Sequence, residues 1–142
     1  MPQSERAAIP RASTWAATHL PLWLRRPPFT TIVDAQLWVV TLVTRPWTFR
    51  LMLDVHHRLR ALPELTCGTH FYGGVGYRLD GVEVAHLHGD GLFDAYLGGG
   101  RAARARAAGL AEAHHADGGP GWVTVDLGVV SAEGVWRVLA QA

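Results

Sequence analysis

The sequence predicts an α+β domain, with one mainly antiparallel sheet of about four or five strands, helices packed on one face and a helical N-terminal arm. Two observations support this class. Apolar residues recur at helical spacing up to Pro63 and alternate with a period of two after it. The chain has 142 residues, enough for one domain with its own core. We therefore place an N-terminal arm at 1–45 and the α+β domain at 46–142.

Two helices are expected before Pro63. Apolar residues at 32, 35, 39, 42 and 43 have helical spacing, although their β-branched content leaves a strand as the alternative. Pro46 suits the first turn of a second helix, which Pro63 ends. Residues 1–28 are rich in proline and are expected to be irregular. Their tryptophans, Trp15 and Trp23, are expected to dock on another part of the protein.

Strands are expected near 69–72, 76–79, 82–88, 92–97 and 122–127. The pair Asp80-Gly81 is a strong signal for a two-residue hairpin and makes the second and third strands antiparallel neighbours. An Arg/Ala helix at about 101–108 is expected to end at Gly109. Ser131 is a good N-cap for a final helix.

Alternation along the strands divides their side chains between two faces of the sheet. One set is apolar and is expected to pack on the helices: Leu79, Ala85, Leu87, Phe93, Ala95, Leu97, Val123, Val125 and Leu127. The opposite set mixes polar and aromatic residues: Val84, His86, His88, Leu92, Asp94, Tyr96, Trp122, Thr124 and Asp126. Such a mixture suits a binding site. It equally suits a sheet face open to water, or one that the N-terminal arm covers.

The most specific chemical pattern is His86-Leu87-His88, because it places two imidazoles on the same side of one strand, within reach of one metal ion. A third ligand can come from the pair His114-His115 or from Asp94. Asp94 and Asp126 also form a candidate acid/base pair. Serine is scarce and lies in no nucleophile context, and the glycine runs match neither a P-loop nor a dinucleotide fingerprint.

Composition limits the partners. The net charge of +1 argues against a dedicated nucleic-acid binder, although residues 1–66 carry eight arginines against four acids and residues 67–142 five against eight. The single cysteine, Cys67, can form no internal disulfide, so nothing indicates an oxidising compartment, and we expect a cytoplasmic protein. Pro10, His19 and Pro21 interrupt the N-terminal apolar stretch, so we expect no signal peptide. Charges and proline interrupt the apolar region 29–53, which predicts no transmembrane helix. Contact with a membrane surface stays open there, because Trp38 and Trp47 lie near arginines.

Three motifs in order resemble a known family. They are GVEVAHLHGDG at 81–91, GLAEAHH at 109–115 and GWVTVDL at 121–127, followed by a Ser-x-Glu helix start. The sequence resembles the small bacterial and fungal proteins labelled luciferase domain-containing, and more distantly the MmcQ/YjbR-like proteins. The first resemblance implies no established light-emitting or monooxygenase activity. The second implies a compact α+β fold, sometimes described as a double-wing DNA-binding type. The luciferase-domain resemblance implies five candidate site residues, at the His and Trp positions of its pattern: His86, His88, His114, His115 and Trp122.

The leading functional prediction is a non-catalytic module that binds a small molecule or a protein partner. Its binding residues would be His86, His88, Tyr96, His114, His115, Trp122 and Asp126. The alternative is a metal-dependent hydrolase in which His86, His88 and His114 hold a divalent ion and Asp94 is the base. A DNA-associated protein is a further alternative by analogy of fold, which the acidic second half disfavours. A divalent metal is the one cofactor considered.

Overall fold

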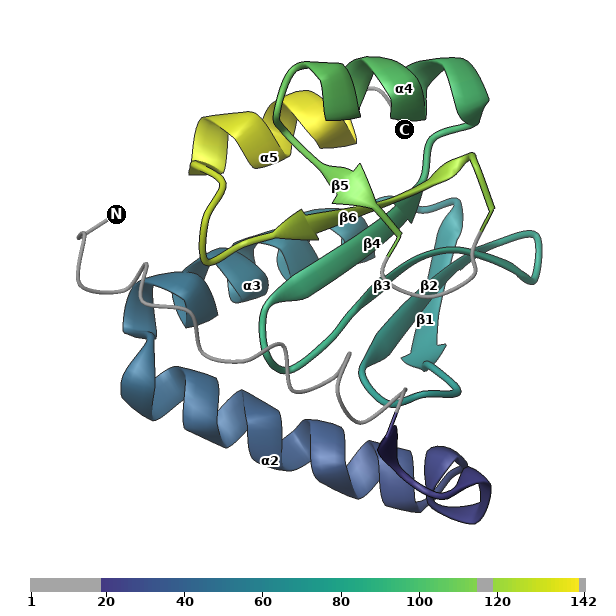
Figure 1. The fold of residues 1–142 in the computed structure, drawn as a ribbon, viewed down its shortest axis with the longest axis vertical. Helices are drawn as coiled ribbons and strands as arrows, with labels where there is room; N and C mark the ends of the chain where they lie inside the picture. The colour runs from purple at the N-terminus through teal and green to yellow at the C-terminus, as the bar shows by residue number, and fades with distance from the viewer. Residues whose placement is uncertain (1–18, 115–118, 141–142) are drawn as a thin grey trace.

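The computed structural model describes residues 19–114 and 119–140. Its centre is a six-stranded antiparallel sheet with the order β1-β2-β3-β4-β6-β5 (Figure 1). The strands are β1 (Leu65–Thr69), β2 (Val75–Leu79), β3 (Val82–Leu87), β4 (Leu92–Tyr96), β5 (Glu112–Ala113) and β6 (Trp122–Asp126). The helices are η2 (Leu22–Arg25), α2 (Phe29–Thr44), α3 (Pro46–Arg60), α4 (Gly99–Ala107) and α5 (Ala132–Leu139). The predicted α+β class is confirmed.

The first two long helices form as predicted. Helix α2 includes the whole region 32–43, so the strand alternative is wrong there, and Pro46 is the first residue of α3. In Figure 1, α2 runs below the ends of the strands, whereas α3 lies behind the sheet. Helix α3 turns Met52, Val55 and Leu59 toward the sheet, where all three are buried. The division at 45/46 between an arm and a domain stays a prediction.

The strand assignments need two corrections. The first strand is β1, at Leu65–Thr69, and the predicted stretch 69–72 is mostly the turn that follows it, in which the Gly73 amide donates to the carbonyl of His70. The short strand β5 pairs with β6 and raises the number of described strands to six. The Asp80-Gly81 hairpin is confirmed, with both residues at positive φ. Ser131 caps α5 by accepting a hydrogen bond from the Gly134 amide at 3.2 Å.

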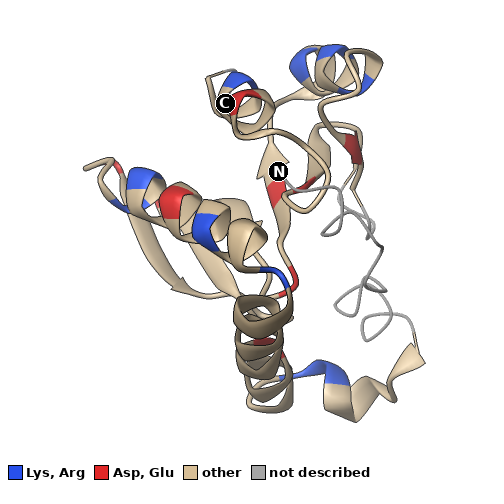
Figure 2. Ribbon diagram, turned by 90° about the vertical axis from the view of Figure 1, so that its left-hand side faces the viewer, with Lys and Arg blue, Asp and Glu red and all other residues tan. Residues whose placement is uncertain are grey.

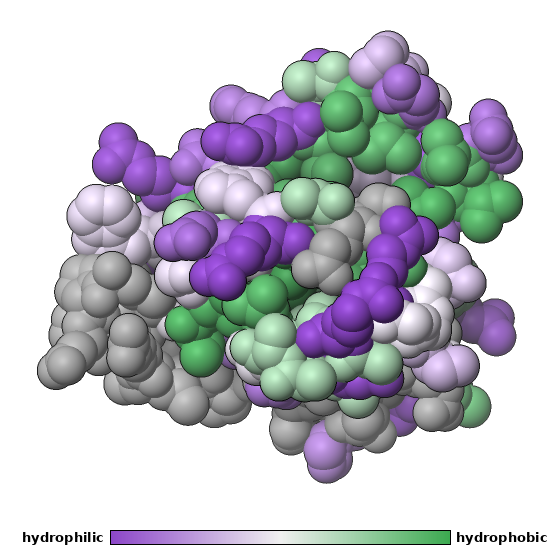
Figure 3. All heavy atoms as spheres, turned by 90° about the horizontal axis from the view of Figure 1, so that it is seen from above, coloured by the Kyte–Doolittle hydropathy of each residue, from purple (hydrophilic) through white to green (hydrophobic). Residues whose placement is uncertain are grey.

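One face of the sheet carries the hydrophobic core. It packs on α3, α4 and α5 and includes nearly the whole predicted apolar set: Ala85, Leu87, Phe93, Ala95, Leu97, Val123, Val125 and Leu127. Leu79 is the exception, because it ends β2 at the hairpin and is 43% exposed. Seen from above in Figure 3, hydrophilic and hydrophobic side chains alternate over the outer surface.

The N-terminal tryptophans were expected to dock. Trp15 lies outside the described residues. Trp23 is 64% exposed. Its aromatic contact within the described part of the chain is with the edge of the Phe29 ring, at 5.7 Å between ring centroids. The expectation is therefore wrong for Trp23, because η2 lies beyond the sheet and presents this side chain outward.

Helix α2 is fixed to the turn between β3 and β4. The Asp34 carboxylate accepts a hydrogen bond from the Gly89 amide at 2.7 Å, and the Thr41 hydroxyl donates to the Gly89 carbonyl at 2.6 Å. Arg45 donates to the Asp90 carbonyl at 2.5 Å. The Trp38 indole donates to the second oxygen of Asp34 at 2.9 Å. These bonds satisfy the buried side chains of Asp34 and Thr41 and the backbone of Gly89.

This contact requires a residue without a side chain at Gly89. A Cβ there would lie 2.5 Å from the carbonyl oxygen of Asp34 and 2.7 Å from the amide of Trp38, both backbone atoms. We expect Gly89→Ala to lower the free energy of unfolding by about 2 kcal/mol, measured by urea denaturation. Gly100→Ala is the matched control, because its Cβ would meet nothing closer than 3.9 Å in an exposed helix. Equal stability of the two variants would contradict this close packing.

Candidate functional site

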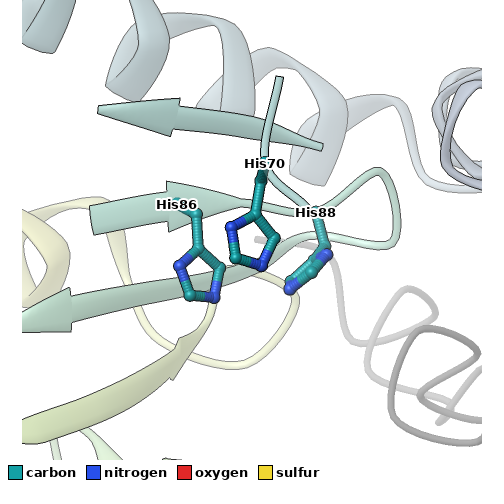
Figure 4. Close-up of side chains that lie close together, drawn as sticks. All are labelled: His70, His86 and His88. Atoms are coloured by element: carbon teal, nitrogen blue, oxygen red, sulfur yellow. The ribbon is translucent and has the colours of Figure 1, made fainter. Parts of the chain in front are cut away.

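Three histidines gather on the sheet face opposite the core (Figure 4). His86 belongs to β3, His88 follows it, and His70 follows β1. The register aligns Thr69 with Val75 and Val75 with Leu87, so the next position along places His70 beside His88. The His70 and His86 rings stack at 3.9 Å with an interplanar angle of 8°. The His88 ring meets the other two edge-on, at 5.6 and 5.1 Å.

Asp94 brings a carboxylate to these rings from β4. It pairs with His86 across the two strands, and its Oδ2 lies 3.0 Å from His86 Nε2 and 3.6 Å from His88 Nε2. The other oxygen accepts a hydrogen bond from the Thr124 hydroxyl of β6. Asp94 is fully buried, and His86 and His88 are 5% and 3% exposed. The site is therefore screened from bulk water, which strengthens its electrostatic interactions.

Glu83 is the second carboxylate of the site. Its Oε1 lies 2.6 Å from His70 Nδ1 and 3.0 Å from His86 Nδ1. Strict alternation along β3 would place Glu83 on the opposite face from His86. The register shifts between Tyr77 and Arg78, and this irregularity turns Glu83 to the histidine side.

Gly76 leaves the space that the Glu83 carboxylate occupies. Gly76 pairs with His86, and a Cβ on it would lie 2.4 Å from Oε2 of Glu83. The same carboxylate oxygen lies 3.3 Å from Arg78. The glycine in β2 and the irregular register of β3 therefore act together to position one acidic side chain.

The surroundings of the cluster shift the pKa values of His86, Glu83 and His70. Burial lowers the pKa of His86, but hydrogen bonds to Asp94 and Glu83 outweigh it and raise that pKa to about 9. Burial raises the pKa of Glu83, but hydrogen bonds from His70 and His86 outweigh it and lower that pKa to about 2. Burial lowers the pKa of His70. In the metal-free protein at neutral pH, a protonated His86 thus lies between two carboxylates and against a neutral His70.

The other predicted site residues lie around this cluster. His114 follows β5, and its Nε2 lies 3.7 Å from Asp94 Oδ1. The Trp122 ring lies 5.5 Å from His86 and 5.6 Å from His114. Tyr96 contacts Trp122 at 5.9 Å and is 51% exposed at the margin. Asp126 accepts a hydrogen bond from the Gly128 amide in the turn after β6. His115 lies outside the described residues.

Two sets of side chains have the spacing that metal coordination requires. Potential ligand atoms of His70, His86 and His88 all lie within 4.8 Å of one another, and so do those of His86, Asp94 and His114. The predicted set of His86, His88 and His114 is thus divided between the two, and His86 belongs to both. His70 also lines a pocket of about 470 Å³, together with Pro27, Pro28, Thr31, Ile32, Thr69, Phe71 and Arg78.

Sequence reasoning missed His70 and Glu83. His70 has no fixed spacing from His86-Leu87-His88. Its place beside His88 depends on the turn between β1 and β2 and on the register shift between β2 and β3, and the Asp80-Gly81 hairpin determines neither. No signal in the sequence marks the irregular pairing that redirects Glu83.

Residues 81–139 match the family model of the Luciferase domain. The matched segment includes His86, His88, Asp94, His114 and Trp122 and excludes His70. No curated protein and no solved structure matches the chain. The more distant resemblance to MmcQ/YjbR-like proteins stays a prediction.

Proposed function

We propose that this protein is a non-catalytic binding module whose ligand is a divalent transition-metal ion, held by His70, His86 and His88. The observation that carries the proposal is the spacing of these residues, whose potential ligand atoms lie within 4.8 Å of one another in a buried site. Three imidazoles suit Zn²⁺ and also Cu²⁺, Ni²⁺ and Fe²⁺. Zinc is the first choice, because structural and catalytic zinc sites commonly use histidine.

The surroundings of the rings support the same ligand. A metal-bound histidine usually directs its second nitrogen at a carboxylate or carbonyl group, which orients the ring and fixes its tautomer. Nδ1 of His70 and Nδ1 of His86 both face Glu83, and Nδ1 of His88 lies 3.8 Å from Asp34. A metal ion would bind the Nε2 atoms of these rings, and at His86 it would replace the proton that Nε2 directs at Asp94, 3.0 Å away.

The pocket beside His70 supplies an entry path for the ion. Zinc–nitrogen bonds are about 2.0–2.1 Å long, so binding draws the three nitrogens closer together. Asp94 lies beside His86 and His88 and can supply an oxygen ligand or balance the charge of the ion.

The experiment is a zinc titration of the untagged protein, with elemental analysis of the purified sample. We expect about one equivalent to bind, and His70→Ala and His88→Ala to lose it. His57→Ala is the matched control, because His57 is exposed on α3. Zinc at about 100 times its Kd is expected to raise the free energy of unfolding by about 2.7 kcal/mol. Absence of stoichiometric metal, or equal losses in all three variants, would refute the proposal. Circular dichroism checks that each variant is folded.

A metal-dependent hydrolase is the second candidate function. The observation that favours it is the position of Asp94 beside all three predicted ligands and the Trp122 ring. Its Oδ2 lies 3.0 Å from His86 and 3.6 Å from His88, and its Oδ1 lies 3.7 Å from His114. Under this candidate, His86, His88 and His114 hold the ion and Asp94 is the base. The test is hydrolysis of ester or phosphate substrates by the zinc-loaded protein. If Asp94→Asn abolishes this activity while the zinc content is unchanged, the protein is an enzyme and not a non-catalytic binding module.

A further inference from the structure

Helix α2 directs its charged residue inward. Asp34 is the one charged residue of the helix, and it is 5% exposed and bonded to Gly89 and Trp38. Thr41, two turns further along, is 1% exposed and also bonded to Gly89. The hydrogen bonds that hold α2 to the β3–β4 turn therefore all lie on its inner side. The outer side of the helix carries no charged residue.

The outer side of α2 is mostly apolar, with the exposed amide of Gln36 among its hydrophobic side chains. Ile32, Val39 and Val43 follow one another at the spacing of one helix face, and they are 53%, 61% and 75% exposed. Phe29 and Val40 flank this row and are 44% and 45% exposed. We call these five residues the α2 patch. Several large hydrophobic side chains exposed on one helix face are typical of an interaction site in a folded protein.

Tryptophan and arginine side chains lie at both ends of the patch. Trp23 packs edge-on against Phe29 at the start of the helix, with exposed Arg26 beside it in the sequence. Beyond the other end, Trp47 is 53% exposed and the Arg50 guanidinium lies 5.9 Å from its ring. Tryptophan and arginine are the residues that lie at the headgroup level of membranes, where one part of the side chain is apolar and the other is in water.

The charge around the patch is positive. Residues 19–60 contain six arginines against Asp34 and Asp54, a balance of 6 − 2 = +4. Asp34 is buried, so the surface of this region carries one acidic side chain. Figure 2 shows arginines before and after α2 and none within it. A surface of this charge attracts anionic lipid headgroups.

A second copy of the chain is a poorer fit to the same patch. A two-fold dimer places identical surfaces against each other. Because both ends of α2 carry exposed arginine, Arg26 or Arg50 would face an arginine of the partner in either orientation of the helices. An anionic bilayer neutralises the same charges.

We propose that the α2 patch docks on the surface of an anionic lipid bilayer, with α2 lying in the plane of the interface. Trp23 and Trp47 enter the headgroup region, and Arg26 and Arg50 contact lipid phosphates. Among the described residues no helix has the length and apolar run that a membrane span needs. The contact that we propose is with the bilayer surface.

The test is co-sedimentation of the full-length protein with phosphatidylcholine vesicles that contain or lack phosphatidylglycerol. We expect binding to the anionic vesicles that weakens as salt is added, and a Val39→Asp/Val43→Asp variant that binds about tenfold more weakly or less. Val82→Asp is the matched control, because Val82 is 66% exposed at the β2–β3 hairpin, and it should bind like the wild type.

Three results would overturn the proposal. The first is no binding to anionic vesicles. The second is equal binding by Val39→Asp/Val43→Asp and by Val82→Asp. The third is a dimer in analytical ultracentrifugation that Val39→Asp/Val43→Asp dissociates while vesicles stay unbound, since this would assign the patch to contact between two copies. Urea denaturation of each variant checks that the loss of binding is not a loss of folding.

Discussion

Substituting alanine for His86 is expected to lower the free energy of unfolding of the metal-free protein by about 3–5 kcal/mol. The imidazole lies 3.0 Å from both Asp94 and Glu83, and Asp94 is fully buried. Removing it leaves these carboxylates without the positive charge that lies between them. Urea denaturation in the presence of a chelator measures the loss.

Two further variants identify the cause of this loss. In His86→Ala/Asp94→Asn the buried negative charge is also removed, so we expect the double variant to be more stable than His86→Ala alone. His57→Ala removes an exposed histidine and is expected to change the stability by about 0.5 kcal/mol or less. If His86→Ala is as stable as His57→Ala, His86 is not needed to compensate the negative charges of Asp94 and Glu83.

Phe93→Ala is the second substitution with a large expected effect. Phe93 is fully buried on the opposite face of β4 from Asp94, within the core that α3, α4 and α5 cover. Truncation removes aromatic contacts and leaves a cavity, and we expect a loss of about 3–5 kcal/mol in the free energy of unfolding. Denaturation by urea, followed by tryptophan fluorescence, measures it.

Phe71→Ala is the control for Phe93, because the Phe71 side chain is 52% exposed. Its cost is expected to be about 0.5 kcal/mol or less. Equal costs for the two variants would contradict the assignment of the core to this face of the sheet.

Strand alternation predicts which face of the sheet carries the buried His/Asp cluster. His86, Asp94 and Thr124 were placed together because β3, β4 and β6 are regular where these residues pair. The same reasoning placed Phe93 and Val125 in the core. Regular antiparallel pairing is a property of the backbone, so a period of two in the sequence carries over directly into space.

Alternation failed where the pairing is irregular. Glu83 changes faces because the register between β2 and β3 shifts, and Leu79 is exposed beside the same shift. His70 follows a strand that begins and ends earlier than its sequence suggested. Tyr96 and Asp126 were placed on the correct strands, but each lies toward the end of its strand and away from the histidines that form the metal sets. Position along a strand follows from turns and register, which the period alone does not determine.

The sheet order also has a kinetic consequence. Strands β1 to β4 are neighbours in both sequence and space, whereas β6 pairs with β4 only after the chain has passed through α4 and β5. Local pairings cost little loop-closure entropy and form early in folding. We therefore expect the four-strand meander, and with it His70, His86, His88 and Asp94, to be assembled before β6 brings Trp122 and Thr124 to their side. The residues that surround the three histidines would then be the last to arrive.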